Sequence, residues 1–281
     1  MERLELALGG LVFDAVADGP PDGPLVLLLH GFPQSARTWR HQVPVLAAAG
    51  FRAVAPDQRG YSPRARPAGV EAYRVAHLTD DVLGMADALG AERFHLVGHD
   101  WGGAVAWQVA GRHPDRLATL TVVSTPHPSA MARSIREGEQ RERSAYMLFL
   151  RSDGAEDALL ADGAALLRLA LEDSGMDPGD ATAYTALMRE RSALTGALNW
   201  YRAAGQGLTE GLGPIVTPTL YVWSTDDVAL GREAAEATAG HVAGDYRFVV
   251  LDGVSHWISE AAPEALNRVL LEHLAPSGRA A

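Results

Sequence analysis

The chain contains no cysteine among its 281 residues. It therefore cannot form a disulfide, bind a metal through thiolates or use a cysteine as a nucleophile. Lysine is also absent, and all 24 basic residues are arginine. A side-chain Schiff base and the Walker phosphate loop both require a lysine. Neither kind of chemistry is available to this protein.

Positive charge is scarce relative to negative charge, because 35 acidic residues outnumber 24 basic ones and give a net charge of −11 at pH 7. This balance disfavours nucleic acids and anionic membranes as partners. The amino terminus lacks the apolar stretch of a signal peptide, and no apolar run approaches the length of a membrane span. We expect a cytoplasmic protein with one large core, or with one core and a small insert, that binds neither nucleic acid nor membrane.

Short apolar runs of strand length recur along the chain, and segments of helical pattern separate most of them. The run at residues 25–29 is continuous, which is typical of a strand buried on both faces of a parallel sheet. Runs at residues 3–8 and 11–17 flank two glycines and predict a hairpin. Further strand-like runs lie at residues 51–55, 94–97, 117–123, 219–223 and 246–251, and helical patterns at residues 39–49, 73–89, 101–111, 232–239 and 263–274. The alternation predicts a mostly parallel α/β sheet.

The alternation stops between about residues 126 and 213, where Arg, Glu, Leu and Ala dominate. We expect several helices there, inserted into the sheet as a lid. The predicted organisation is a core formed by residues 1–126 and 214–281, with a helical cap at residues 127–213. Within the insert, the charges of residues 133–143 alternate in sign, a pattern typical of an exposed helix face. Its many leucines and alanines predict an apolar pocket wall.

The stretch Gly98-His99-Asp100-Trp101-Gly102 joins the run at residues 94–97 to the next helical pattern. A nucleophile with glycine two positions before and after it, between a strand and a helix, is typical of a nucleophile elbow. The turn is too tight for side chains at the two glycine positions. Asp100 occupies the tip, where the commoner motif has serine. Because a carboxylate with a reference pKa of about 3.9 is already ionised at neutral pH, Asp100 is the predicted nucleophile.

Two further strand-like runs end in groups that could assist Asp100. Asp226 and Asp227 follow one of these runs, and His256 follows the last. The carboxyl ends of parallel strands meet at one edge of a sheet, so we expect these groups to lie close together. The order nucleophile, acid, histidine is that of the α/β-hydrolases. Either aspartate could be the acid, and the other could cap the following helix.

Several motifs resemble those of one known family and together span almost the whole chain. They are His30-Gly31-Phe32-Pro33, Asp57-Gln58-Arg59-Gly60-Tyr61, Gly98-His99-Asp100-Trp101-Gly102-Gly103, Asn199-Trp200-Tyr201-Arg202 and Gly253-Val254-Ser255-His256-Trp257. The chain resembles an α/β-hydrolase of the epoxide hydrolase branch, similar to soluble epoxide hydrolases and related to haloalkane dehalogenases. The resemblance implies the α/β-hydrolase fold, in which a mostly parallel, eight-stranded sheet carries helices on both faces and an inserted helical cap.

The resemblance also implies a role for each motif residue. Asp100 would form an alkyl ester with the substrate, His256 would activate the water that hydrolyses this ester, and Asp227, whose spacing from the strand matches the family, would orient His256. The backbone N–H groups of Phe32 and Trp101 would form the oxyanion hole.

The lid is expected to supply two proton donors. Tyr146 and Tyr201 would protonate the epoxide oxygen, because a tyrosine stays protonated at pH 7. His30, Trp200 and Trp257 would line the substrate pocket. The expected partners are a small apolar epoxide-type substrate and water. The sequence leaves the oligomeric state open, a homodimer included.

No cofactor and no metal are expected. The histidines outside the motifs are too scattered for a metal site and are interpreted as structural or solvated; they include His41, His77, His95, His113, His127 and His241. Asp57 and Arg59 are interpreted as a structural pair.

Three functions are compatible with these residues. The first is an epoxide hydrolase, which converts an epoxide and water to a vicinal diol. The second is a haloalkane or haloacid dehalogenase with the same Asp-His-Asp triad. A leaving halide needs side-chain N–H donors, but Phe32 has none, and Trp101 stands where fluoroacetate-type dehalogenases have arginine. The third is a non-catalytic ligand-binding protein on a hydrolase fold, which the complete catalytic set disfavours.

Overall fold

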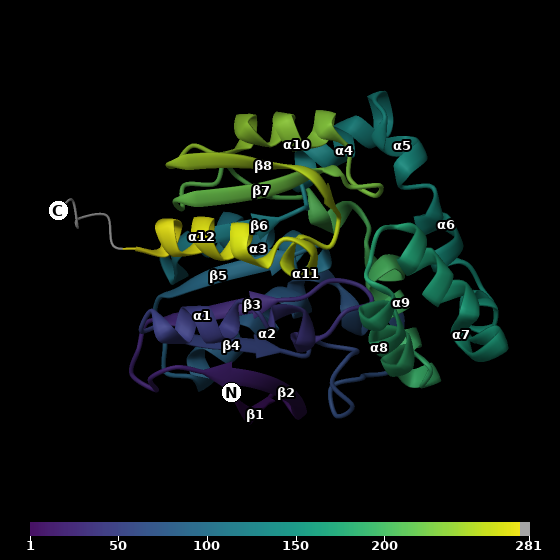
Figure 1. Cartoon of the computed structure of the whole chain (residues 1–281), viewed down its shortest axis with the longest axis horizontal. Coiled ribbons are helices and arrows are strands. Elements are labelled where there is room, and N and C mark those ends of the chain that lie inside the picture. The colour runs from purple at the N-terminus through teal and green to yellow at the C-terminus, as the bar shows by residue number, and fades with distance from the viewer. Residues whose placement is uncertain (276–281) are drawn as a thin grey trace.

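The computed structural model describes residues 1–275, and its strands form an eight-stranded sheet (Figure 1). The strands are β1 (Glu2–Leu8), β2 (Leu11–Asp18), β3 (Leu25–Leu29), β4 (Arg52–Pro56), β5 (Phe94–His99), β6 (Leu117–Val123), β7 (Thr219–Asp226) and β8 (Tyr246–Ser255). Their order across the sheet is β1-β2-β4-β3-β5-β6-β7-β8. Pairing is antiparallel from β1 to β4 and parallel from β4 to β8. The expected mostly parallel sheet is confirmed.

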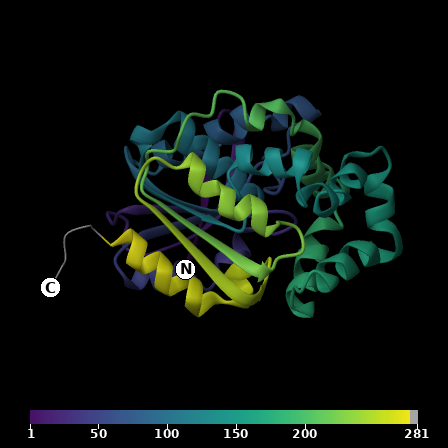
Figure 2. The same ribbon diagram turned by 90° about the horizontal axis from the view of Figure 1, so that it is seen from above.

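The apolar run of β3 explains why helices cover both faces of the sheet. Leu27 belongs to one core, together with apolar residues of α2 and α3. Its neighbour Leu28 belongs to a second core, with residues of α1 and α12. Successive residues of a strand face opposite sides of the sheet, so a continuous apolar run needs cover on both. Figure 2 shows the two helical layers with the sheet between them. These helices are α1 (Val43–Ala48), α2 (Val75–Ala88), α3 (Trp101–Arg112) and α12 (Pro263–Leu274).

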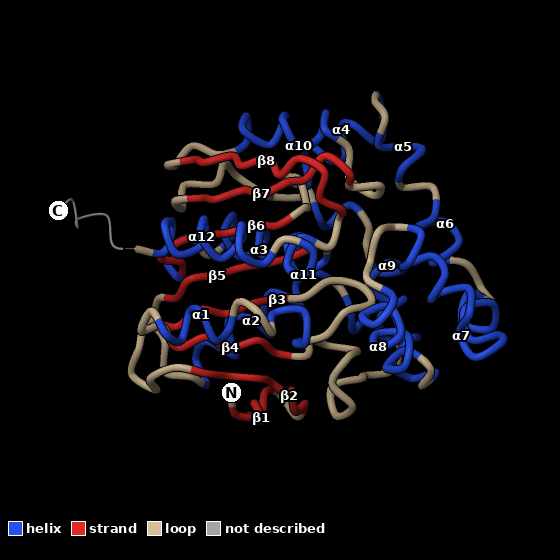
Figure 3. Tube along the Cα trace, viewed as in Figure 1, coloured by secondary structure: helices blue, strands red, loops and turns tan. Residues whose placement is uncertain are grey.

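Among its described residues, the segment between β6 and β7 consists of helices and loops, with one isolated bridge from Ile215 to Val242 (Figure 3). Its helices are α4 (Pro128–Glu137), α5 (Gln140–Arg143), α6 (Tyr146–Arg151), α7 (Ala155–Asp173), α8 (Pro178–Met188) and α9 (Arg191–Ala203). Helix α7 is interrupted at residues 161–164, where the backbone leaves the helical conformation. The insertion α5–α9 lies beyond the carboxyl ends of the strands (Figure 1). The expected helical cap is thereby confirmed.

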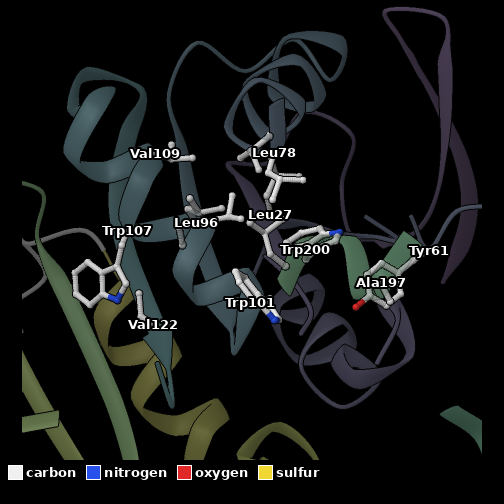
Figure 4. Close-up of a cluster of buried hydrophobic side chains, with 14 of the residues drawn as sticks. Leu27, Tyr61, Leu78, Leu96, Trp101, Trp107, Val109, Val122, Ala197 and Trp200 are labelled. Atoms are coloured by element: carbon white, nitrogen blue, oxygen red, sulfur yellow. The ribbon is translucent and has the colours of Figure 1, made fainter. Parts of the chain in front are cut away.

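The cap shares its apolar core with the sheet rather than having one of its own. Trp200 of α9 is 2% exposed and belongs to the same cluster as Leu27 and Leu78. Its ring packs edge-on against Trp101, with the ring centroids 5.9 Å apart (Figure 4). Large aromatic side chains contribute most of the apolar area that such a contact buries. The position of α9 is therefore coupled to that of the elbow helix α3.

Polar contacts also attach the cap to the core. Arg40 forms ion pairs with Asp180 of α8 at 2.6 Å and with Glu260 of α11 (Ile258–Ala261) at 2.7 Å. Gly60 and Gly196 bring the two parts close together, because a Cβ atom on Gly196 would lie 2.7 Å from the Gly60 Cα. Gly60 has a φ of 91°, which only glycine adopts without strain. Neither glycine can be replaced without moving α9.

The interpretation of Asp57 and Arg59 as a pair is wrong. The Oδ1 atom of Asp57 accepts a hydrogen bond from the Ala36 N–H at 2.7 Å. Arg59 instead forms two hydrogen bonds of 2.7 Å with the carboxylate of Asp81 in α2. Both residues lie in the loop that follows β4. A loop has no repeating backbone geometry that would place the side chains of residues two positions apart on the same side, so closeness in the sequence does not bring these two together.

Several predicted boundaries also differ. In place of the helix predicted at residues 39–49, the structure has a 3₁₀ turn, η1 (Ala36–Trp39), followed by the shorter helix α1. A proline is tolerated only in the first turn of a helix, so Pro44 lies at the beginning of α1 and the helix cannot extend further back. The helix predicted at residues 73–89 begins at Val75, after η2 (Val70–Tyr73) and an extended Arg74. The other 3₁₀ turns are η3 (Pro114–Arg116), η4 (Gln206–Leu208) and η5 (Thr238–His241), and helix α10 (Arg232–Ala237) precedes η5.

In the described part of the chain, no helix has the length and apolar character needed to cross a membrane.

Candidate active site

Asp100 stands at the tip of a sharp turn between β5 and α3. Its φ is 51°, an uncommon value for a residue other than glycine. A Cβ atom on Gly98 would lie 2.3 Å from the Gly102 carbonyl oxygen, and one on Gly102 would lie 2.3 Å from the Leu29 carbonyl oxygen. Both positions therefore require glycine. The sequence folds here into the strand–turn–helix geometry of a nucleophile elbow.

Asp100, His256 and Asp227 come together at the carboxyl ends of β5, β7 and β8. The Nδ1 atom of His256 lies 2.7 Å from Oδ2 of Asp227, and its Nε2 atom lies 3.8 Å from Oδ2 of Asp100. The other oxygen of Asp227 accepts hydrogen bonds of 2.9 Å from the Ala229 and Leu230 N–H groups. The neighbouring Asp226 is exposed and its carboxylate contacts Thr225. Of the two adjacent aspartates, the structure thus brings Asp227 to His256.

Backbone N–H groups face the Asp100 carboxylate. The Phe32 N–H donates to Oδ1 of Asp100 at 2.8 Å. Burial raises the pKa of Asp100 above its usual value, and the His256 charge and the amides of Phe32 and Trp101 offset part of that rise. Both amides therefore stabilise negative charge on this carboxyl group, as donors in an oxyanion hole do.

Opposing effects act on His256, which is buried with Asp227 on one side and Asp100 on the other. Burial lowers its pKa. The charge and hydrogen bond of Asp227, together with the charge of Asp100, raise the pKa by more than burial lowers it, so that the net shift is upward. The proton affinity of the imidazole therefore depends on both carboxylates.

Tyr146 of α6 and Tyr201 of α9 face this site from the cap. Their ring centroids are 6.5 Å apart, and the Tyr201 ring lies 5.4 Å from the ring of Phe32. Burial, with the nearby Asp100 charge, raises the pKa of both hydroxyls. Both phenols are consequently protonated, and available as donors, over the neutral pH range.

A cavity of about 520 Å³ connects these groups. Its wall is mostly apolar and includes Phe149, Leu150, Leu159, Leu166, Leu167 and Leu171 of the cap. Asp100, Tyr146, Tyr201, His256 and Trp257 also line it. Small-molecule sites typically combine such an apolar wall with a few convergent polar groups.

Two of the predicted pocket residues do not line this cavity. The Nδ1 atom of His30 lies 2.9 Å from the Gly31 carbonyl oxygen, and its Nε2 atom accepts a hydrogen bond from the Gln58 N–H at 3.1 Å. Burial lowers the pKa of His30 to about 4, so its ring is neutral and holds two loops together. Trp200 donates from Nε1 to the Arg59 carbonyl oxygen and lines a second cavity of about 460 Å³, which Trp101 also lines and Asp100 does not.

Comparison with known proteins agrees with this architecture. The family model described as alpha/beta hydrolase fold matches residues 24–263. The chain belongs to the α/β-hydrolase family. This α/β-hydrolase is 34% identical to the AB hydrolase superfamily protein YfhM of Bacillus subtilis, over 94% of the chain and 95% of the relative. It is 33% identical to Epoxide hydrolase A of Mycobacterium tuberculosis, over 97% of each protein.

A solved structure is similar over the same length. The crystal structure of Epoxide Hydrolase A from Mycobacterium thermoresistibile matches with a TM-score of 0.84 and 31% sequence identity, over 97% of this chain and 98% of the other. This α/β-hydrolase therefore has epoxide hydrolases among its relatives, as its motifs predict.

The sequence does not indicate two residues of this α/β-hydrolase that lie near the site. Gln140 and Arg143 belong to the charged run at residues 133–143, whose alternating charges predict an exposed helix face. Gln140 is instead fully buried, and Arg143 lines the cavity. Alternating charges do not distinguish a solvated face from one that docks on a loop, so no signal in the sequence marks these two residues.

Among residues 1–275, no cluster of three or more His, Asp or Glu side chains is arranged to hold a metal ion.

Titration of His256 in variants of the two adjacent aspartates, Asp226 and Asp227, tests the electrostatics of the site. In the wild type, NMR of histidine-labelled protein should give His256 a pKa above 6.5. Asp227→Asn should lower this pKa, because burial then opposes a single carboxylate charge. Asp226→Asn is the matched control and should leave the pKa unchanged. An equal fall in both variants, or none in Asp227→Asn, would contradict the pairing of His256 with Asp227.

Proposed function

We propose that this α/β-hydrolase is an epoxide hydrolase that forms a covalent ester on Asp100. The observation that carries the proposal is the shared cavity, which Asp100 lines together with Tyr146 and Tyr201. A carboxylate is suited to attack a saturated carbon. Opening an epoxide also produces an alkoxide, which needs a proton from the opposite side. The names of the relatives support the same reaction class.

In the first step, Oδ2 of Asp100 attacks one ring carbon of the epoxide, because Oδ1 is held by the Phe32 N–H. The new bond joins this oxygen to carbon, and the bond from the same carbon to the epoxide oxygen breaks. The epoxide oxygen receives a proton from Tyr146 or Tyr201. The product is a hydroxyalkyl ester of Asp100.

In the second step, His256 removes a proton from water, and the water oxygen attacks the ester carbonyl carbon of Asp100. Negative charge develops on Oδ1, where the amides of Phe32 and Trp101 stabilise it. Collapse of the tetrahedral intermediate breaks the bond from the carbonyl carbon to the alkyl oxygen and releases the diol. The water oxygen remains in the Asp100 carboxyl group. Its two protons, one held by His256 and one on the new carboxyl group, return to the leaving alkoxide and to the tyrosinate, which restores the Asp100 carboxylate, the neutral imidazole and the tyrosine.

Ester formation also prepares His256 for its role. The Asp100 charge is one of the contributions that raise the pKa of His256. Esterification removes this charge and so lowers the pKa, which favours the neutral imidazole that the second step needs. The base thus becomes available when its substrate, the ester, is present.

Dehalogenation receives less support from the structure. Trp101 packs edge-on against the Tyr201 ring and lines the second cavity rather than the one that Asp100 lines. Trp257 donates from Nε1 to the Ser174 hydroxyl at 3.0 Å. The Trp257 N–H is therefore engaged and Trp101 lies outside the lining of the Asp100 cavity, whereas Tyr146 and Tyr201 both line it. A non-catalytic binding role does not explain the convergence of nucleophile, histidine and acid.

We also propose the division of the chain into a core of residues 1–126 and 214–281 and a cap of residues 127–213. Residues 276–281 lie outside the described part of the chain. Helix α4, which opens the proposed cap, packs against α10. The helices that follow it carry Tyr146, Tyr201 and most of the apolar cavity wall.

An assay with styrene oxide and with a haloalkane of similar size tests the proposed reaction. We expect diol from the epoxide and no halide release from the haloalkane. Asp100→Ala should abolish diol formation, because no other group in the site can form the ester. Halide release at a rate comparable to diol formation would favour a dehalogenase, and activity that survives Asp100→Ala would exclude the proposed nucleophile.

The tyrosines predict a separate effect on ring opening. Tyr201→Phe should lower kcat/KM for styrene oxide by about tenfold to a hundredfold, at or below the lower end of the roughly 10²- to 10⁴-fold that general acid catalysis supplies, because Tyr146 remains as a donor. The substitution keeps the ring and its packing against Phe32. Tyr246→Phe is the control, because the Tyr246 hydroxyl is buried without a hydrogen-bond partner among the described residues and the residue does not line the cavity, and it should keep kcat/KM near the wild-type value. Equal losses in both variants would indicate a structural role for Tyr201.

A further inference from the structure

Helix α5 of the cap places a buried amide side chain against the loop that follows β7. Gln140 is fully buried, although charged residues surround it in the sequence. Its Nε2 atom donates to the Ala229 carbonyl oxygen at 2.6 Å, and its Oε1 atom accepts a hydrogen bond from the Gly231 N–H at 2.8 Å. One side chain therefore satisfies two backbone groups of the loop at residues 227–231.

Arg143, one helical turn further along α5, bonds the start of the same loop. Its NH1 atom donates to the Asp227 carbonyl oxygen at 2.8 Å. The contact is close along the whole segment, because a Cβ atom on Gly231 would lie 2.4 Å from the Glu139 carboxylate. The cap thus contacts the loop at its beginning, middle and end.

This loop also holds the carboxylate that orients His256. The N–H groups of Ala229 and Leu230 donate to Oδ1 of Asp227, which leaves Oδ2 for His256. Ala229 is therefore bonded at both ends of its backbone, through its N–H to Asp227 and through its carbonyl to Gln140. A buried backbone group that loses its partner costs free energy, so the loop would rearrange if Gln140 could not bond it.

We propose that Gln140, assisted by Arg143, is a positioning residue for the hydrolysis of the covalent ester. The inference rests on the proposed function, in which ester formation needs Asp100 and the tyrosines, while ester hydrolysis needs His256 and Asp227. A residue that acts through the Asp227 loop affects the second step and spares the first. The cap therefore contributes to both steps, through its tyrosines to ring opening and through Gln140 to hydrolysis.

Rapid-quench single turnovers with styrene oxide separate the two steps, because intact-protein mass spectrometry follows the ester as it forms and decays. Gln140→Leu keeps the size of the side chain and removes both loop contacts. We expect ester decay to slow by about tenfold, the scale of one unsatisfied buried hydrogen bond. Ester formation should stay within about twofold of the wild-type rate. The pH profile of ester decay should also change, because a misplaced Asp227 raises the His256 pKa less.

Gln108→Leu is the matched control. Gln108 is also fully buried and donates to a backbone carbonyl oxygen, that of Leu208, at 2.7 Å. It is in α3, away from the Asp227 loop, so the same substitution there should leave the ratio of decay to formation at the wild-type value. Arg143→Met provides a second test if Gln140→Leu does not fold. It removes the bond to the Asp227 carbonyl and an ion pair with Glu139 at 3.5 Å, and it should slow decay in the same direction by a smaller factor.

The outcomes distinguish this inference from the proposed function. Asp227→Asn should accumulate ester, and a failure to detect ester in this variant would overturn the proposed function and the inference with it. If Asp227→Asn accumulates ester while folded Gln140→Leu and Arg143→Met decay at the wild-type rate, the function stands and the inference is wrong. Formation and decay slowed equally in Gln140→Leu would also overturn the inference, since a general structural defect would produce that result.

Discussion

The hydrogen bond from the Phe32 N–H to the Asp100 carboxylate, 2.8 Å long, joins the ends of β3 and β5 at the point on which the site depends. The backbones approach so closely there that a Cβ atom on Gly31 would lie 2.3 Å from the Asp100 Cβ. Asp100 itself has a strained φ of 51°, a conformation that costs on the order of 1–3 kcal/mol and persists only where the surrounding structure imposes it. The sheet and α3 impose it, and the result is an ionisable side chain directed into an apolar cavity.

The cavity environment gives that carboxylate its chemistry. Burial disfavours the charged form, and the backbone amides and His256 restore part of the lost stabilisation. The groups that support the carboxylate are also those that the proposed reaction requires, since the amides would receive the developing oxyanion and His256 would activate water. Because the cap contributes Tyr146, Tyr201 and the apolar wall, and shares its core with the sheet, this environment exists only when cap and sheet are packed together.

Much of this arrangement could be predicted from the sequence, because its signals are local. The run at residues 25–29 marks a doubly covered strand, and the glycines around Asp100 mark the elbow. Other features depend on contacts that no local pattern encodes. Arg59 pairs with Asp81 of a distant helix, His30 turns away from the cavity to bond Gln58, and Gln140 is buried within a run of charges. In each case a long-range contact decides where the side chain lies, and residue type alone leaves several partners open.

The proposed mechanism depends on a covalent ester on Asp100, and the fate of the water oxygen tests this ester most directly. A single turnover with excess enzyme in water enriched in oxygen-18 should place the heavy oxygen in the Asp100 carboxylate, detectable by mass spectrometry of the peptide that contains it. The diol from that first turnover should carry only ordinary oxygen. Heavy oxygen in the first-turnover diol, with none in Asp100, would show that water attacks the epoxide directly and would contradict the covalent mechanism.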